Sequence, residues 1–248
     1  MLARAAALLV RPGCGGFLER GHSVQGMWTT WNIGQAGALL LAALLALPLA
    51  VLLSRAAYLL PRALDAGMAA EPSLAHRRWR NGFHAACLGM AMLCAWRFGA
   101  TPAAAAAIVY TLTLLALAWV DAETGFLPDK LTLPLLWLGL LVNLDGAFAP
   151  LPEAVLGAAG GYAALWSIRQ LFLWLTGRVG MGDGDFKLLA ALGAWLGWMS
   201  LPWVLLAASS SALIVALGLR LAGRAQAGDA LRFGPYLAAA GILGLLRL

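Results

Sequence analysis

The chain has 248 residues, of which 62% are hydrophobic and only 11% are charged. A soluble globular domain carries about 25% charged residues, so this composition excludes a soluble protein and predicts an integral membrane protein. The formal net charge of +6 arises from basic residues in short clusters between apolar stretches. Such clusters, without an interleaved stacking surface, do not indicate a nucleic-acid partner.

Residues 1–26 differ in character from the rest of the chain. The segment "RPGCGGFLERGHS" is too polar to span a membrane, and "LARAAALLV" is too short. We expect a poorly ordered N-terminal extension over 1–26. The alternative is that translation starts at Met27, directly after this segment.

Apolar stretches recur along the remaining sequence and contain many small residues, which allow helices to approach closely in lipid. Several are shorter than the roughly 20 residues of a perpendicular span, and short spans are tolerated inside a bundle. We predict an all-α, polytopic transmembrane helical bundle with about 7–8 spans, in which 27–82 holds the first helix and a short cytoplasmic segment and 83–248 forms the membrane domain. The candidate spans are 33–54, 83–97, 102–120, 131–144, 154–176, 188–199, 202–219 and 234–246.

The basic residues between these stretches are distributed unevenly, which predicts the orientation of the chain. One side would hold only Arg97 and Arg247, apart from the three arginines of the N-terminal extension. We therefore assign the richer side to the cytoplasm, and this assignment places 121–131 and 180–187 there. The basic residues of the cytoplasmic side are Arg55, Arg62, Arg77, Arg78, Arg80, Lys130, Arg178, Lys187, Arg220, Arg224 and Arg232.

Two aspartates lie where apolar stretches meet these loops. Asp121 follows "LTLLALAWV", and Asp185 precedes "FKLLAALGAWLGW" within the segment "GMGDGDFK". A carboxyl group in such a place is partly desolvated, and a second carboxylate nearby raises the pKa of one of the two. Two carboxyl groups that share one proton supply a base and an acid, as in aspartic proteases. Asp121 and Asp185 are therefore the catalytic candidates.

The glycines of the second loop, Gly180, Gly182 and Gly184, can adopt backbone angles closed to other residues and permit close approach of another backbone. The loop lacks the G-K-[ST] ending of a phosphate-binding loop. Helix capping is the simplest interpretation of Asp129 and Asp183. Lys187 either pairs with a loop aspartate or extends toward the membrane surface.

Together the two loops resemble those of type IV prepilin peptidases, membrane aspartic proteases of the GxGD class. The matching segments are Asp121 with "LPDKLTLPLLWLGLLVN" and the segment "GMGDGDFK", and the resemblance extends over about 85–248, including "RFGPYLAAAG". It implies catalytic roles for Asp121 and Asp185. The residues expected to shape the loops or support the substrate are Leu127, Pro128, Asp129, Gly180, Gly182, Gly184 and Lys187.

The resemblance also implies an activity and a location. Such enzymes cleave the basic leader peptides of type IV prepilins or secretion pseudopilins at the cytoplasmic face of the bacterial inner membrane, without a cofactor for proteolysis. Bifunctional members also methylate the new amino terminus from S-adenosylmethionine, and carry two C-x-x-C pairs, thought to bind zinc, after the first span. The interval 55–82 contains no cysteine here. We therefore expect no metal, and a need for S-adenosylmethionine only if methylation were retained, which this absence argues against.

Two other classes of protein are alternatives to a peptidase. A proton- or ion-coupled transporter would show inverted repeats and a site near the membrane midplane, whereas these aspartates lie at loop edges. A catalytically inactive pilus or secretion assembly protein would not need both aspartates, and a cleavage assay on a matched prepilin separates it from a peptidase.

Overall fold

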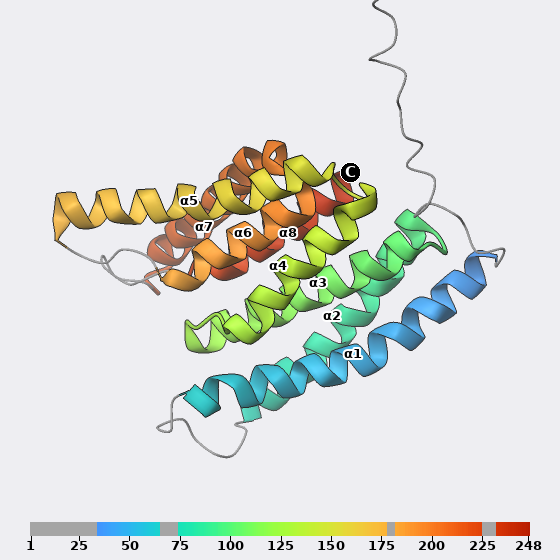
Figure 1. Ribbon diagram of the computed structural model, residues 1–248. Coiled ribbons are helices and arrows are strands. Elements are labelled where there is room, and N and C mark those ends of the chain that lie inside the picture. The colour runs from blue at the N-terminus through green and yellow to red at the C-terminus, as the bar shows by residue number, and fades with distance from the viewer. Residues whose placement is uncertain (1–33, 65–73, 178–181, 225–231) are drawn as a thin grey trace, which may run out of the picture.

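The computed structural model describes residues 34–64, 74–177, 182–224 and 232–248 (Figure 1). The predicted extension over 1–26 and the loop residue Gly180 lie outside these ranges. Within them every regular element is a helix, which confirms the all-α prediction. In chain order they are α1 (Gln35–Leu64), α2 (Leu74–Phe98), α3 (Pro102–Thr124), α4 (Asp129–Val142), η1 (Asn143–Asp145), α5 (Leu151–Thr176), α6 (Asp183–Leu196), η2 (Trp198–Ser200), α7 (Leu201–Leu221) and α8 (Gly234–Arg247).

Each predicted apolar stretch overlaps one of the described α-helices, but several boundaries are wrong. Helix α1 continues ten residues beyond 54, and α2 begins nine residues before 83, so that much of the predicted cytoplasmic segment is helical. The predicted stretches 131–144 and 188–199 run past the ends of α4 and α6. The stretch 188–199 was expected to be continuous, whereas α6 ends at Leu196. The cause is Gly197, whose φ of 76° and ψ of 165° belong to a region that residues with a side chain rarely enter. The chain breaks there and continues as the short helix η2.

Three helical segments in the described ranges are long and apolar enough to cross a membrane: Gln35–Ala63, Pro102–Thr124 and Trp198–Leu221. Helices α4, α6 and α8 have 14 residues each, a length of about 21 Å against a hydrocarbon thickness of about 30 Å. The predicted class of membrane helical bundle is supported, and the number of spans stays a prediction.

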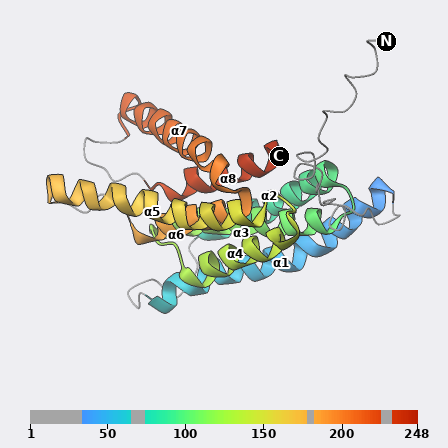
Figure 2. The ribbon, with the colours of Figure 1, turned by 45° about the horizontal axis from the view of Figure 1, so that its top comes forward.

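Helix α3 lies at the centre of the bundle. It packs against α1 and α2 on one side and against α8 on the other, and α6 packs against α4, α5 and α8 (Figure 1). Helix α7 contacts α8 and lies on the outside of the bundle (Figure 2). The chain thereby brings the end of α3 and the starts of α6 and α8 to one end of the molecule.

Small residues mark the closest helix contacts. The buried residues of α1 recur every four positions at Ala42, Ala46 and Ala50, on the side that packs against α2 and α3. Where α5 crosses α6, Gly157 and Gly193 are in backbone contact, and a methyl group on either would overlap the carbonyl of the other. In lipid, such close contacts replace the hydrophobic effect as the source of helix association.

Buried polar side chains also tie the helices together. Asn143, at the end of α4, donates from Nδ2 to the carbonyls of Ala194 and Trp195 at 2.9 and 3.0 Å, and its Oδ1 accepts from two backbone N–H groups. Tyr110 of α3 donates to the carbonyl of Gly241 in α8 at 3.1 Å. These bonds satisfy groups that would be costly to leave unpaired in an apolar interior.

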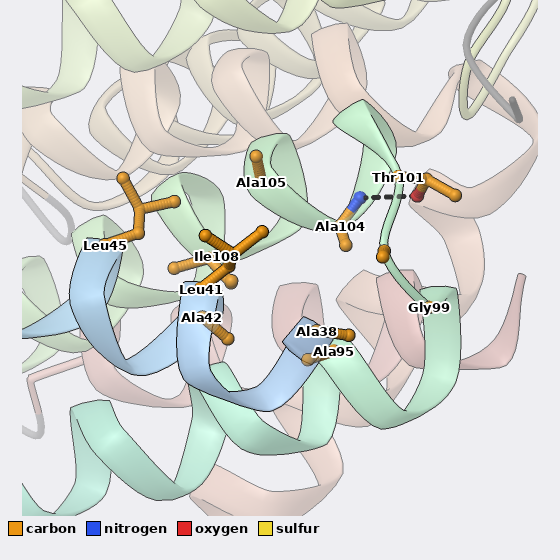
Figure 3. Close-up of a pocket in the computed structure, with 11 residues that line it drawn as sticks. Ala38, Leu41, Ala42, Leu45, Ala95, Gly99, Thr101, Ala104, Ala105 and Ile108 are labelled. Atoms are coloured by element: carbon orange, nitrogen blue, oxygen red, sulfur yellow. Dashed lines mark hydrogen bonds between the residues drawn. The ribbon is translucent and has the colours of Figure 1, made fainter. Parts of the chain in front are cut away.

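A small apolar pocket of about 250 Å³ lies between α1, α2 and α3, at the N-terminal end of α3 (Figure 3). Its wall consists of alanine, leucine, isoleucine and glycine with Thr101, whose hydroxyl accepts from the N–H of Ala104 and caps α3. No titratable side chain lines it. The chemistry of the chain must therefore be sought at the other end, where the acidic loops lie.

Candidate active site

Asp121 occupies the last turn of α3. The helix ends because Gly125 adopts a left-handed conformation (φ 71°) and donates its N–H to the carbonyl of Asp121 at 2.8 Å. The Asp121 residue is only 6% exposed, and its Oδ2 has no hydrogen-bond partner in the described parts of the chain. A buried carboxylate oxygen without a partner is rare in proteins and calls for an explanation. A shared proton or a water molecule is the natural partner.

Asp185 occupies the first turn of α6 and is 8% exposed. Its burial, and secondly the negative charge of Asp121, raise the pKa of Asp185 from 3.8 to about 7. The fold thus brings together two carboxyl groups that are 64 positions apart in the sequence. At neutral pH a large fraction of Asp185 is protonated, as a general acid requires.

The two loops touch through Leu127 and Gly184. A Cβ atom at position 184 would lie 2.6 Å from the Leu127 Cβ, so glycine is required there by packing. The expected unusual backbone angles are not found at Gly182, whose φ is −74° and whose surroundings leave open space for a side chain. The role of glycine in this loop is therefore close approach at Gly184, because Leu127 is buried against it.

An ion pair forms a second link between the loops. The Nζ of Lys187 in α6 donates to both carboxylate oxygens of Asp129 at 2.7 Å. Lys187 therefore pairs with a loop aspartate and does not extend to the membrane surface. Asp129 is the first residue of α4, directly after the buried Pro128. Because both charged groups are partly exposed, the pair contributes only about 0–1 kcal/mol to stability, and its main effect is on loop geometry.

The start of α6 is also held from α5. Asp183, which was interpreted as a simple cap, forms an ion pair with Arg169. The guanidinium of Arg169 lies over the ring of Phe186, 5.6 Å from its centre. The residues on both sides of Asp185 are thus fixed by neighbouring helices.

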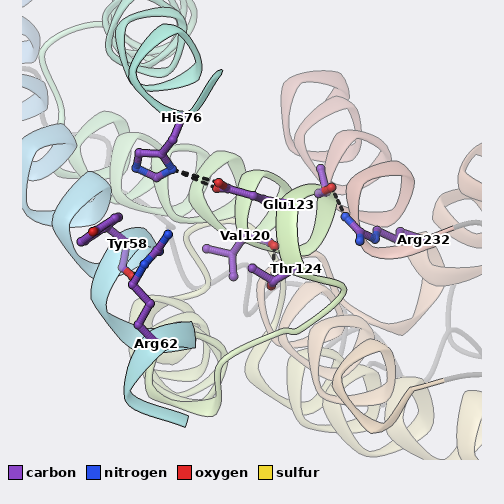
Figure 4. A network of polar contacts seen from close by, with 8 residues as sticks. Tyr58, Arg62, His76, Val120, Glu123, Thr124 and Arg232 are labelled. Atoms are coloured by element: carbon purple, nitrogen blue, oxygen red, sulfur yellow. Dashed lines mark hydrogen bonds and ion pairs between the residues drawn. The ribbon is translucent and has the colours of Figure 1, made fainter. Parts of the chain in front are cut away.

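The start of α8 contributes two residues that sequence reasoning did not assign. A Cβ atom at Gly234 would lie 2.6 Å from Oδ2 of Asp121, and the N–H of Gly234 faces the Asp121 carboxylate. Arg232 donates to the carbonyl of Ala122 (Figure 4). Its positive charge also acts on the carboxyl group of Asp121. The available signal was the segment "RFGP", an arginine and a glycine directly before the proline that begins an apolar helix.

A further polar pair lies on another face of α3. Nδ1 of the buried His76 in α2 lies 3.0 Å from Oε1 of Glu123 (Figure 4). Tyr58 and Trp119 pack against the imidazole ring. This pair links α2 to the turn that carries Asp121. In the described ranges no group of three histidine, cysteine, aspartate or glutamate side chains is placed as metal ligands would be.

The fold and this site define a helical membrane protein with a pair of buried aspartates at one end of the bundle. Residues 108–217 match the model of the type IV leader peptidase family. This part of the chain is similar to that family, in agreement with the resemblance of its two loops. The match includes Asp121 and Asp185 and ends before Arg232 and Gly234. No solved structure matches the chain.

Curated relatives agree with this similarity. The chain is 48% identical over 160 residues to a "Prepilin leader peptidase/N-methyltransferase" of Pseudomonas putida. The matched region is 64% of this chain and 56% of the relative. A relative with the same name from Aeromonas salmonicida is 54% identical over 141 residues, which are 57% of this chain and 48% of the relative. Another from Neisseria gonorrhoeae is 46% identical over 149 residues, which are 60% of this chain and 51% of the relative. The chain spans about half the length of these relatives.

Proposed function

We propose that this protein is an aspartic endopeptidase that removes leader peptides from type IV prepilins or pseudopilins. The observation that carries this proposal is the buried pair of Asp121 and Asp185, one at the end of α3 and the other at the start of α6. The names of the similar proteins supply the substrate class.

The surroundings of the two carboxyl groups suggest how they divide the work. Asp121 faces the N–H of Gly234 and the positive charge of Arg232, and both groups stabilise a negative charge on its carboxyl group. Asp121 would therefore act as the base that takes a proton from the attacking water. The protonated Asp185 would stabilise the developing oxyanion at the scissile carbonyl and later help to protonate the leaving amine.

The position of the pair fits a substrate that is cut at the membrane surface. Asp121 ends an apolar helix long enough to cross a bilayer, so a peptide bond between a polar leader and a hydrophobic helix would reach the site at the boundary. We place this boundary on the cytoplasmic face of the bacterial inner membrane, because the basic loops lie at the same end.

We propose no cofactor for proteolysis and no methyl transfer by this chain. Methyl transfer is part of the relatives' names. The interval 55–82 contains no cysteine, and its described residues offer no thiolates for a zinc-supported module of the kind expected in bifunctional members. The residues present do not fit that module, and no step of the proposed reaction passes through S-adenosylmethionine.

Co-expression with a matched prepilin, followed by mass measurement of the substrate's amino terminus, tests the proposal. We expect a mature substrate without the added mass of about 14 Da that one methyl group brings. Asp121→Asn and Asp185→Asn should each abolish cleavage while the protein accumulates in the membrane, and Asp145→Asn, exposed at the far end of α4, should cleave normally. Processing by either catalytic variant would refute the assignment.

A further inference from the structure

A polar pocket of about 570 Å³ opens between α1 and α2 at the end of the bundle that carries the acidic loops. It is separate from the paired aspartates, neither of which lines it. The residues of its wall that can meet a polar ligand are Ser54, Arg55, Tyr58, Arg80, Asn81 and His84.

The pocket carries positive charge that the described residues do not neutralise. Arg55 and Arg80 are both exposed, and neither forms an ion pair or a hydrogen bond with any residue in the described ranges. The carboxylate of Glu123 is engaged by His76, which also meets this wall. His84 and Ser54 are joined by a hydrogen bond of 3.2 Å. Two guanidinium groups with hydroxyl and amide donors suit a phosphate group.

A row of exposed apolar side chains on α1 leads to this pocket. Val51, Arg55 and Leu59 follow one another at four-residue spacing and therefore share one face of the helix. Val51 is 44% exposed and Leu59 is 59% exposed, and the same face continues through the exposed Leu44 and Leu47. The helix is one of those long and apolar enough to cross a membrane. An acyl chain lying along this face would end beside Arg55.

A residue of α2 indicates the level of the pocket in the membrane. Trp79, next to Arg80 at the start of α2, is 66% exposed. Exposed tryptophan is typical of the interface between lipid and water, and so is a cluster of arginines on the cytoplasmic side. The pocket therefore lies at the level of lipid head groups.

We propose that the α1–α2 pocket binds an anionic phospholipid, with its phosphate between Arg55 and Arg80 and one acyl chain along the outer face of α1. Basic pockets between membrane helices on the cytoplasmic side bind lipid head groups in this way. The site is independent of the peptidase chemistry, since it uses neither Asp121 nor Asp185.

The test compares lipids on the full-length protein in phosphatidylcholine nanodiscs. Phosphatidylglycerol is titrated in, and its occupancy is followed by native mass spectrometry of the released protein and by the rise in unfolding temperature. Arg55→Gln with Arg80→Gln should weaken phosphatidylglycerol binding about 30-fold, because each arginine near an anionic lipid contributes about fivefold. The matched control, Arg220→Gln with Arg224→Gln, removes two charges at the end of α7 and should change it less than twofold.

Other results would overturn the proposal. Equal weakening in the control pair would show a general effect of surface charge. Stabilisation by inorganic phosphate as large as that by phosphatidylglycerol would show a site for the free anion. If the glutamine pair does not fold, the test rests on wild type and on Arg55→Lys with Arg80→Lys, which should keep most of the binding. Absence of any preference for phosphatidylglycerol over phosphatidylcholine in the wild type would itself refute the lipid site.

Discussion

Leu127 rests directly on Gly184, so that a methyl group at position 184 would come within 2.6 Å of the Leu127 Cβ. This contact joins the loop after Asp121 to the helix turn that carries Asp185. A second link, from Lys187 to Asp129, lies beside it. Both carboxyl groups are therefore positioned by the contact between their own loops, and a small expansion of this contact should separate them.

The Leu127–Gly184 contact predicts opposite outcomes for two neighbouring glycines. Gly184→Ala should reduce cleavage at least tenfold and lower the free energy of unfolding by about 1–3 kcal/mol, the usual cost of overpacking. Gly182→Ala should be close to wild type, because φ is −74° and no atom of the described residues lies within 4 Å of the added Cβ. Cleavage rates and thermal unfolding of both variants in detergent measure this. Equal activity of the two alanine variants would contradict the packing argument.

Arg232 should set the acidic limit of the pH–activity profile. Its positive charge lies close to Asp121 and stabilises a negative charge there, so Arg232→Gln should shift the acidic limb of kcat/KM to higher pH. Arg232→Lys should restore part of the shift, which a purely structural role would not explain. Arg247→Gln, at the other end of α8, serves as the control. An unchanged acidic limb in Arg232→Gln would remove Arg232 from the mechanism.

The raised pKa of Asp185 predicts that the stability of the folded protein depends on pH. This pKa is raised from 3.8 to about 7 in the folded protein, so the folded state holds a proton that the unfolded chain has already lost above pH 4. The contribution of Asp185 to the free energy of unfolding therefore falls as the pH rises from about 4 to 7 and is constant above pH 7. The whole decrease is at most about 4 kcal/mol. Asp185→Asn should remove this fall.

Thermal unfolding of wild type and Asp185→Asn at pH 5 and pH 8 measures the effect. The variant should gain stability over wild type at pH 8 and gain much less at pH 5. Asp145→Asn controls for the loss of one negative charge at an exposed position. A wild-type protein that is more stable at pH 8 than at pH 5, with no change in the variant, would show that Asp185 is not held in its protonated form.

The orientation of the site can be checked by thiol labelling. In a version without native cysteines, Lys130→Cys should react with a membrane-impermeant reagent in inverted vesicles and not in intact spheroplasts. Asp145→Cys, at the opposite end of α4, should show the reverse pattern. Both positions are exposed, so access depends on the membrane side alone. The opposite labelling of the two positions would invert the proposed topology.

Sequence reasoning succeeded where the signal was local. Asp121 and Asp185 each lie at the junction of an apolar helix and a loop, and each helix overlaps an apolar stretch of the sequence. The polar ends of α1 and α2 were not predicted to be helical, because they lack the apolar composition on which the prediction relied. The contribution of Gly234 was not predicted, because a glycine has no side-chain chemistry and its contact with Asp121 spans more than a hundred residues of sequence. The His76–Glu123 pair was not predicted either, because a single histidine in a sequence gives no indication of its partner. Gly182 and Gly184 looked equivalent until the packing of Leu127 distinguished them.

The backbone contact between Gly157 and Gly193 restricts how a substrate can enter. Two helices whose main chains touch cannot slide or separate without losing their tightest packing, so α5 and α6 should move as one rigid body that carries Asp185. If the proposed polypeptide substrate is the true one, we predict that it enters by displacement of the helices that pack against α5 and α6, on the side of α4 or of α8. Hydrogen exchange should accordingly be slow across the middle of α5 and α6, and faster in the outer helix α7.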